Sequence, residues 1–244
     1  MEQMKSTKEI QAIIWDYDGT LVDTSLKNYN VTKRIIKDMT GIDPEKFPAL
    51  NSLESYISAN NRAANWRELY KTEFDFTAEQ IDHSGKLWTP YQLDDNTPVP
   101  FFDGIQTVIQ ALKMFPQGIV SQNSKNGIIK QLEDYNLIEY FSCIIGYEEV
   151  SLNRQKPEPD GLLVCIEKLA SEHSGYIVYI GDHETDVICA HKANRHIYNA
   201  NRGLKIVTIG AFYSFFINNT SWSCQPNFIA KKPKNILQVL TKIK

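Results

Sequence analysis

Two aspartates, Asp16 and Asp18, stand two positions apart directly after the apolar run 10–15. The run is typical of a buried strand, so both carboxylates are expected where a strand ends, which is where open α/β sheets bind ligands. Carboxylates this close concentrate negative charge, which a protein tolerates beside a cation or with raised pKa values. A hard divalent cation with oxygen ligands is the simplest partner. Gly19 permits a sharp chain reversal next to this site, and the hydroxyl of Thr20 is placed to fix the loop.

Ser121 and Asn123 follow a second predicted strand and begin a helix. A hydroxyl, an amide and a helix N-terminus together form a good cradle for an anion. Helix capping is the alternative, because serine and asparagine are preferred at helix starts for their own sake. Lys156 precedes a Pro-x-Pro turn. A fixed ammonium group there suits both a phosphoryl group and paired aspartates, although most lysines are simply solvated.

Asp182 and Asp186 lie four positions apart, where a third apolar run ends and a helix is predicted to begin. At that spacing the two carboxylates can be presented near one point. The helix dipole alone accounts for an acidic residue such as Asp186 in a first helical turn. It does not account for Asp182, which stands at the end of a strand after a glycine. The pair therefore adds to the acidic groups expected at one edge of the sheet.

The elements that must position these residues alternate from residue 104 onward. Apolar runs predict strands, and helical spacing predicts helices between them; the strands are 117–121, 141–146, 175–181 and 204–210, and the helices 104–114, 124–135, 159–171 and 184–194. Such alternation predicts an α/β fold with a doubly wound parallel sheet. Segment 24–98 instead shows helical spacing almost throughout and predicts an all-helical insert, which leaves 1–23 and 99–244 as the core domain.

The breaks within the insert are also predicted. Gly41 and Pro44 are expected to end its first helix, and Gly85, Pro90 and the prolines at 98 and 100 to mark its exit. Residues 194–203 look longer than a usual helix-to-strand connection. The polar loop 217–227 follows a dense aromatic cluster at 212–216.

Composition excludes several classes of protein. A hydrophobic share of 42% and a charged share of 23% are those of a soluble globular chain. The net charge of -3 does not favour nucleic acid or an anionic membrane as a partner. No apolar run approaches the ~20 residues that cross a bilayer, and the polar first residues do not suit a secretion signal, so the cytoplasm is expected. The four cysteines and five histidines lack zinc-site spacing, and three cysteines are interpreted as reduced core residues.

The octet Asp16-Tyr17-Asp18-Gly19-Thr20-Leu21-Val22-Asp23 closely resembles the nucleophile motif of the haloacid dehalogenase-like (HAD) hydrolase superfamily. Three later motifs resemble that superfamily in sequence order, namely Ser121 at a strand end, Lys156 before Pro-x-Pro, and the Gly-Asp-x-x-x-Asp run that contains Asp182. The resemblance extends from residue 10 to about 240. It implies a Rossmann-like core, and the insert looks like the α-helical cap of the phosphoglycolate phosphatase and β-phosphoglucomutase branch.

The resemblance also implies a mechanism. Asp16 would attack phosphorus and form an aspartyl-phosphate, and Asp18 would act as general acid and base. Mg2+ would be held by Asp16, the backbone carbonyl of Asp18, and Asp182, with Asp186 as an outer or water-mediated ligand. The phosphoryl oxygens would be bound by a separate set of residues, Ser121, Asn123 and Lys156.

The function implied is a magnesium-dependent phosphatase of a small phosphorylated metabolite, acting as a monomer or homodimer without a nucleic-acid or membrane partner. The presence of Asp18 argues against a dehalogenase, because those enzymes lack the second aspartate. Two alternatives remain: a phosphomutase of the β-phosphoglucomutase type, which usually has another residue at the Thr20 position, and a catalytically silent binding protein on the same scaffold. Candidates for contact with the leaving group are Arg62, Arg67, Tyr70 and Lys71, although a solvated helix face accounts for each of them.

Overall fold

The computed structural model describes residues 9–63, 65–200, 202–213 and 222–243. The chain forms two compact units, which are described separately. The first contains the described residues up to 21, from 101 to 213 and from 222 onward, and the second is residues 22–100. Part of the polar loop 217–227 and of the aromatic cluster 212–216 lies outside the described residues. The role of segment 24–98 as a cap domain stays a prediction.

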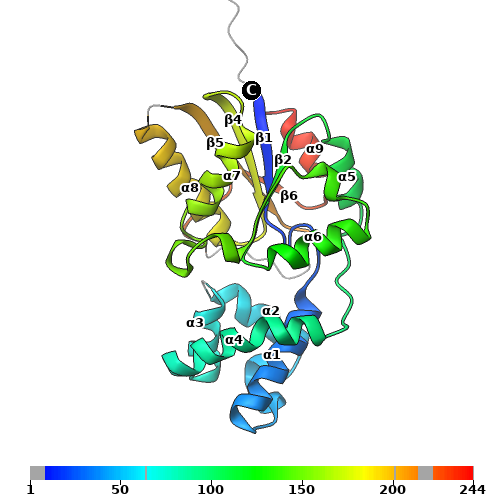
Figure 1. The fold of residues 1–244 in the computed structure, drawn as a ribbon, viewed down its shortest axis with the longest axis vertical. Helices are drawn as coiled ribbons and strands as arrows, with labels where there is room; N and C mark the ends of the chain where they lie inside the picture. The colour runs from blue at the N-terminus through cyan, green and yellow to red at the C-terminus, as the bar shows by residue number, and fades with distance from the viewer. Residues whose placement is uncertain (1–8, 64, 201, 214–221, 244) are drawn as a thin grey trace, which may run out of the picture. The chain divides into compact units, whose positions relative to one another are not determined.

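The first unit is built on a six-stranded parallel sheet with strand order β3-β2-β1-β4-β5-β6 (Figure 1). Its strands are β1 Ile10–Trp15, β2 Gln117–Val120, β3 Cys143–Ile145, β4 Ser174–Gly181, β5 Gly203–Ala211 and β6 Phe228–Ala230. Chain order reverses direction between β1 and β4, and such a switch point is where ligands bind at the carboxyl ends of the strands. The predicted α/β fold with a doubly wound parallel sheet is confirmed.

Helices cover both faces of this sheet. They are α5 Ile105–Ala111, α6 Lys125–Asp134, α7 Asp160–Leu169, α8 Glu184–Asn199 and α9 Asn235–Leu240. Buried side chains of α7 and α8 pack with Ala12 and Ile14 of β1 in one hydrophobic cluster. Side chains of a strand alternate between the two faces of the sheet. Gln117 pairs in register with Ile13 and therefore points to the opposite face from Ala12 and Ile14. There its side-chain amide donates to the carbonyl of Ile109 in α5 at 3.0 Å.

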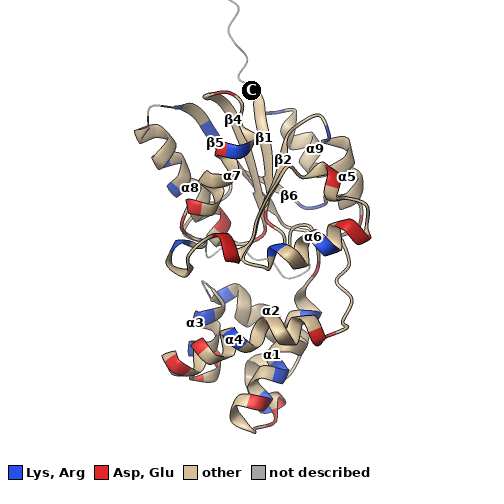
Figure 2. Ribbon diagram, viewed as in Figure 1, with Lys and Arg blue, Asp and Glu red and all other residues tan. Residues whose placement is uncertain are grey.

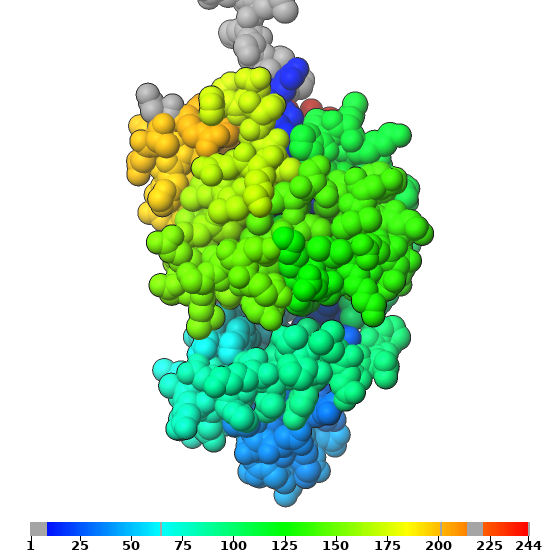
Figure 3. Space-filling model, in the orientation of Figure 1, coloured from blue at the N-terminus to red at the C-terminus, as the bar shows by residue number. Residues whose placement is uncertain are grey.

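Burial of β1 is nearly complete. Its last four residues are fully buried, and in Figure 3 later parts of the chain, coloured green and yellow, cover most of this blue strand. The three cysteines at 143, 165 and 189 are buried and free, in keeping with their interpretation as core residues. A strand that is buried on both faces consists mainly of consecutive apolar residues. For this reason the sequence predicts β1.

Helix α8 is longer than predicted. It continues to Asn199 rather than ending near 194, so most of the segment interpreted as a long connection is helical. Ile197 is buried on this extension. Just before this extension, the side chain of Asn194 binds both the backbone N–H of Ile206 at 2.7 Å and its carbonyl at 2.9 Å, which ties the helix to β5.

The second unit is helical, as predicted for most of its length. It contains α1 Ser25–Thr40, α2 Leu53–Arg62, α3 Trp66–Phe74 and α4 Ala78–Asp94, with short 3-10 helices at Pro44–Lys46 and Pro48–Leu50. Gly41 ends α1 in the left-handed region, as predicted. The exit predicted at Gly85 and Pro90 is wrong, because α4 runs through both. A Cβ on Gly85 would lie 2.9 Å from Cη2 of Trp66, so this glycine permits close packing of α3 on α4.

Charged residues of both signs are interspersed along the ribbon of each unit (Figure 2). None of the helices in the described ranges is long and apolar enough to cross a membrane.

Candidate active site

Asp16 stands at the carboxyl end of β1, at the switch point of the sheet. Its backbone N–H donates to the carbonyl of Ile180 at 2.7 Å, so the pairing of β1 with β4 continues to this residue. The residue is 5% exposed. Strand pairing therefore fixes the Asp16 carboxylate at the sheet edge where the resemblance expects a nucleophile.

The loop after Asp16 turns sharply at Gly19. Gly19 has φ 77°, and a Cβ there would lie 2.1 Å from Oδ2 of Asp182. Glycine is thus needed both for the left-handed conformation and for the close approach of the Asp182 carboxylate. The predicted reversal at this position is confirmed, and its function is to let the two acidic loops meet.

Thr20 does not fix this loop through its hydroxyl, contrary to expectation. Its Oγ1 is buried and finds no hydrogen-bond partner among the described residues. The loop is held instead by its backbone, with the N–H of Leu21 donating to the carbonyl of Tyr17 at 2.9 Å. Tyr213 adds a second restraint, because its hydroxyl donates to the carbonyl of Thr20 at 2.5 Å. Only the aromatic cluster signalled Tyr213 in the sequence.

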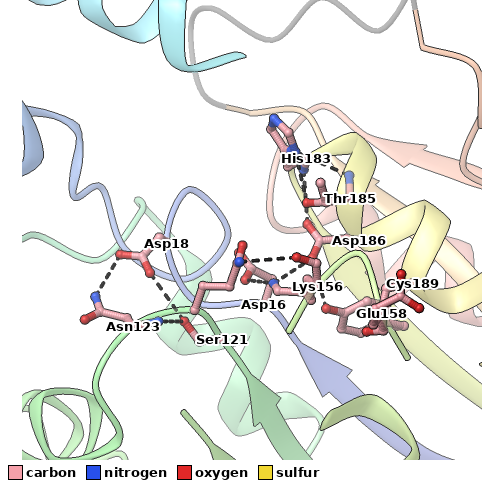
Figure 4. Close-up of polar contacts among 12 residues, drawn as sticks. Asp16, Asp18, Ser121, Asn123, Lys156, Glu158, His183, Thr185, Asp186 and Cys189 are labelled. Atoms are coloured by element: carbon pink, nitrogen blue, oxygen red, sulfur yellow. Dashed lines mark hydrogen bonds and ion pairs between the residues drawn. The ribbon is translucent and has the colours of Figure 1, made fainter. Parts of the chain in front are cut away.

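Lys156 joins two carboxylates (Figure 4). Its Nζ lies 2.5 Å from Oδ1 of Asp16 and 2.7 Å from Oδ1 of Asp186, and the lysine is 8% exposed. Its backbone carbonyl accepts a hydrogen bond at 3.3 Å from the side-chain amide of Gln122, beside Ser121. Desolvation lowers the pKa of Lys156, but the two carboxylates outweigh it and hold that pKa above its usual value. The lysine therefore stays charged inside the site.

Asp186 is bound on both of its oxygens. Besides Lys156, Oδ1 accepts from the hydroxyl of Tyr179 at 2.9 Å, while Oδ2 accepts from the backbone N–H of His183 at 3.2 Å and caps helix α8. Gly181 makes room for it, because a Cβ there would lie 2.4 Å from Cγ of Asp186. From sequence only the helix dipole accounted for Asp186. In the structure its side chain both caps α8 and contacts Lys156.

Three carboxylates, those of Asp16, Asp182 and Asp186, form an acidic cluster in which one ligand oxygen from each lies within 4.8 Å of the others. Opposite ligands of a magnesium ion bound at 2.0–2.1 Å are about 4 Å apart, so small shifts would bring these oxygens onto one ion. Carboxylate oxygens are also the donors that such a hard cation prefers. The cluster includes Asp186, which the sequence analysis assigned to an outer position.

Electrostatics support a cation in this cluster. Desolvation, together with the Asp186 and Asp18 carboxylates, raises the pKa of Asp16 to about 7 despite the opposing effect of Lys156. Desolvation and the charges of Asp16 and Asp186 also raise the pKa of Asp182 well above its usual value. One ammonium group thus compensates only part of the negative charge gathered here. A divalent cation would supply the rest.

Asp18 faces the end of the neighbouring strand β2. Its Oδ1 accepts from the side-chain amide of Asn123 at 3.0 Å, and its Oδ2 accepts from the hydroxyl of Ser121 at 3.4 Å. The backbone N–H of Asn123 donates in turn to the Ser121 oxygen at 3.0 Å. Two of the three residues predicted to bind phosphate, Ser121 and Asn123, therefore hold Asp18 in this structure, as Figure 4 shows.

Glu184 anchors a segment that sequence reasoning did not connect to the site. Its Oε1 accepts from the backbone N–H and the hydroxyl of Ser223 at 2.5 and 2.7 Å, and from the N–H of Cys224 at 3.1 Å. The ring of Trp222 lies 6.3 Å from that of His183, between centroids. Residues 222–224 thus lie beside the first turn of α8. The sequence gives no signal for this, because an acidic residue in a first helical turn is accounted for by the dipole.

Three of the four candidate specificity residues, Arg62, Arg67 and Tyr70, have contacts within the helical unit. Arg62 pairs with Glu73 at 2.7 Å and Arg67 with Asp82 at 2.6 Å. Tyr70 is 1% exposed and packs among aromatic rings. These contacts favour a structural role over contact with a substrate for both arginines and for the tyrosine.

Comparison with known proteins identifies the family. The model of the haloacid dehalogenase-like hydrolases matches residues 13–200, which include the ends of β1, β2 and β4 and the Lys156 turn. The chain belongs to this family. The predicted family and the prediction of a hydrolase are therefore confirmed.

Named relatives of this HAD hydrolase are phosphatases. Pyrophosphatase PpaX of Listeria monocytogenes is 24% identical over 96% of this chain and 98% of its own length. Phosphoglycolate phosphatase of Photorhabdus laumondii is 25% identical over 78% of this chain and 79% of its own length. Among solved structures, a haloacid dehalogenase-like family protein of Streptococcus pneumoniae is 18% identical, with a TM-score of 0.71 over 94% of this chain and 98% of that one. The structural likeness shows a shared fold.

Proposed function

We propose that this HAD hydrolase is a magnesium-dependent phosphatase that acts on a small phosphate ester through an aspartyl-phosphate. The observation that supports this best is the arrangement around Asp16. Its carboxylate ends β1, Lys156 binds one of its oxygens at 2.5 Å, and two further carboxylates, Asp182 and Asp186, lie in the same cluster. A fixed carboxylate beside an ammonium group and a metal site is suited to nucleophilic attack on phosphorus.

Asp16 is the proposed nucleophile. Lys156 orients this carboxylate and, once a phosphate ester is bound, also faces the negative charge of the phosphoryl group. Attack by an Asp16 oxygen forms the bond to phosphorus while the bond from phosphorus to the leaving oxygen breaks. Water then cleaves the aspartyl-phosphate and releases inorganic phosphate. Splitting one displacement into two lowers the barrier of each step.

Asp18 is the proposed general acid and base. It donates a proton to the leaving oxygen in the first step and removes a proton from the attacking water in the second. Asn123 and Ser121 hold its carboxylate from the adjacent strand end at 3.0 and 3.4 Å. These hydrogen bonds fix the orientation of the Asp18 carboxylate, and neither Asn123 nor Ser121 forms a covalent bond in the proposed reaction. Binding of phosphoryl oxygens by Ser121 and Asn123 stays part of the proposal.

The acidic cluster is the proposed magnesium site. Asp16, Asp182 and Asp186 would hold the ion with the backbone carbonyl of Asp18. When bound, magnesium neutralises charge on the transferred phosphoryl group and reduces its repulsion by the Asp16 carboxylate.

Pyrophosphate and phosphoglycolate are the first substrates to test, because relatives across most of the chain are named for them. The panel adds sugar phosphates and nucleotides, each assayed with and without Mg2+, and Asp16→Asn is the control. Release of inorganic phosphate that needs both Mg2+ and Asp16 is expected. Transfer to a second sugar position rather than to water would instead indicate a phosphomutase, and equal function of Asp16→Asn would indicate a silent scaffold.

A further inference from the structure

Tyr179 is a buried residue of β4 that the proposed mechanism does not use. It is 1% exposed, and its hydroxyl donates to Oδ1 of Asp186 at 2.9 Å. The same oxygen accepts from Nζ of Lys156 at 2.7 Å. Two donors, one neutral and one charged, therefore share a single carboxylate oxygen. The other oxygen of Asp186 is bound by the backbone N–H of His183 at 3.2 Å.

The sharing of Lys156 depends on how strongly each carboxylate attracts it. An ammonium group has three N–H donors, and Lys156 donates one hydrogen bond to Asp16 and one to Asp186 in this structure. A phosphoryl group that binds here must draw on the same group. A carboxylate that already accepts other hydrogen bonds attracts an ammonium less strongly, because part of its charge is satisfied. The Tyr179 hydroxyl therefore weakens the hold of Asp186 on Lys156.

We infer that Tyr179 is a positioning residue of this site, which acts through Asp186 to keep Lys156 shared between Asp16 and a bound phosphoryl group. This rests on the proposed phosphatase function. Without the hydroxyl, Asp186 attracts Lys156 more strongly, and the lysine turns away from the phosphoryl position. Binding of phosphate is then weakened, although every residue that touches phosphate is still present.

Tyr17 provides a matched control. It is 2% exposed and lies two residues after the neighbouring strand β1, but its hydroxyl donates at 2.8 Å to the neutral side chain of Gln131. Tyr17→Phe and Tyr179→Phe each remove one buried hydroxyl and keep the ring. A purely structural loss should therefore affect the melting temperatures of both variants, whereas only Tyr179→Phe should change the binding of phosphate.

The first test compares the two variants in steady-state kinetics and in inhibition by inorganic phosphate. Tyr179→Phe should lower kcat/KM about tenfold, the scale of one hydrogen bond to a charged group, and should raise the Ki of phosphate. Tyr17→Phe should leave both constants close to those of the parent. Equal kinetic effects of the two variants, or a lower melting temperature of Tyr179→Phe with unchanged Ki, would overturn the inference.

The second test is a double-mutant cycle with Asp186→Asn, read by calorimetric binding of inorganic phosphate. Tyr179→Phe should weaken binding in the parent and have much less effect in the Asp186→Asn background, because the two residues act as one unit. Additive effects would overturn the inference. Phosphate binding also separates the two proposals. If the parent hydrolyses no ester of the panel, the proposed phosphatase function is wrong. The role of Tyr179 is still tested, because unchanged phosphate affinity in Tyr179→Phe would overturn it.

Discussion

Gly19→Ala should disable the site without unfolding the protein. The new methyl group would lie 2.1 Å from Oδ2 and 2.5 Å from Cγ of Asp182. Ordinary contact between such atoms needs about 3.5 Å, so Asp182 or the Gly19 loop must move by more than about 1 Å. A displacement of that size at a catalytic site costs about 100-fold in rate. We therefore expect kcat/KM to fall about 100-fold.

Gly104→Ala is the matched control for this substitution. Gly104 has φ 80°, close to that of Gly19, lies in the same unit, and a Cβ there would meet no described atom within 4 Å. In both variants an alanine in the left-handed conformation should lower the free energy of unfolding by about 1 kcal/mol. This corresponds to a fall of about 2–4 °C in melting temperature for a chain of this size. The assay is phosphate release together with thermal unfolding. Equal activity of the two variants would refute the reasoning that Asp182 needs the space above Gly19.

Two further predictions concern the buried charges. Burial raises the pKa of Asp16 from 3.8 to about 7. Between these two pH values the folded protein binds a proton at Asp16 that the unfolded chain has lost. The metal-free protein should therefore lose stability as pH rises toward about 7. Asp16→Asn should flatten the dependence of melting temperature on pH. If Mg2+ binds the ionised carboxylate as proposed, it should stabilise the parent more at about pH 8 than at about pH 6. Parallel curves of melting temperature against pH for the parent and Asp16→Asn would contradict this. Lys156→Met should cost about 3–5 kcal/mol in urea unfolding, because it leaves two buried carboxylates without their cation. Lys192→Met, which breaks a partly exposed pair with Glu158 at 2.5 Å, should cost at most about 1 kcal/mol. Equal losses of stability in Lys156→Met and Lys192→Met would contradict the expected effect of burial around Lys156.

Strand positions in the α/β unit could be predicted because buried parallel strands leave continuous apolar runs. Strand β6 was not predicted, since a run of three residues carries no periodicity. It pairs in parallel with β5, and hydrogen bonds of the residue before it help to fix its place. Asn227 accepts from the N–H of Thr208 at 2.9 Å, and its own N–H donates to the Thr208 hydroxyl at 2.9 Å. Helix α9 is similarly short and was also missed.

In the site, too, the residues that could be predicted from sequence are those that belong to a recognisable motif. The motifs predicted Asp16 at a strand end, where the strands of a parallel sheet converge at one edge, and Lys156 before a Pro-x-Pro turn. They could not identify Tyr179 or Tyr213, whose hydroxyls are brought to Asp186 and to the Thr20 carbonyl only by the packing of the folded chain. A buried tyrosine in a strand is ordinarily a core residue, and no local pattern tells where its hydroxyl will point.

Trapping of a phosphorylated protein tests the central claim most directly. A substrate labelled in its transferred phosphoryl group is mixed with the protein and Mg2+ and quenched in acid. Borohydride reduction of the quenched sample then converts a phosphorylated aspartate to homoserine for detection by mass spectrometry. The account predicts label on the protein, homoserine at position 16, and loss of both signals in Asp16→Asn. Phosphate release with no label on the protein, or with label at another residue, would contradict it.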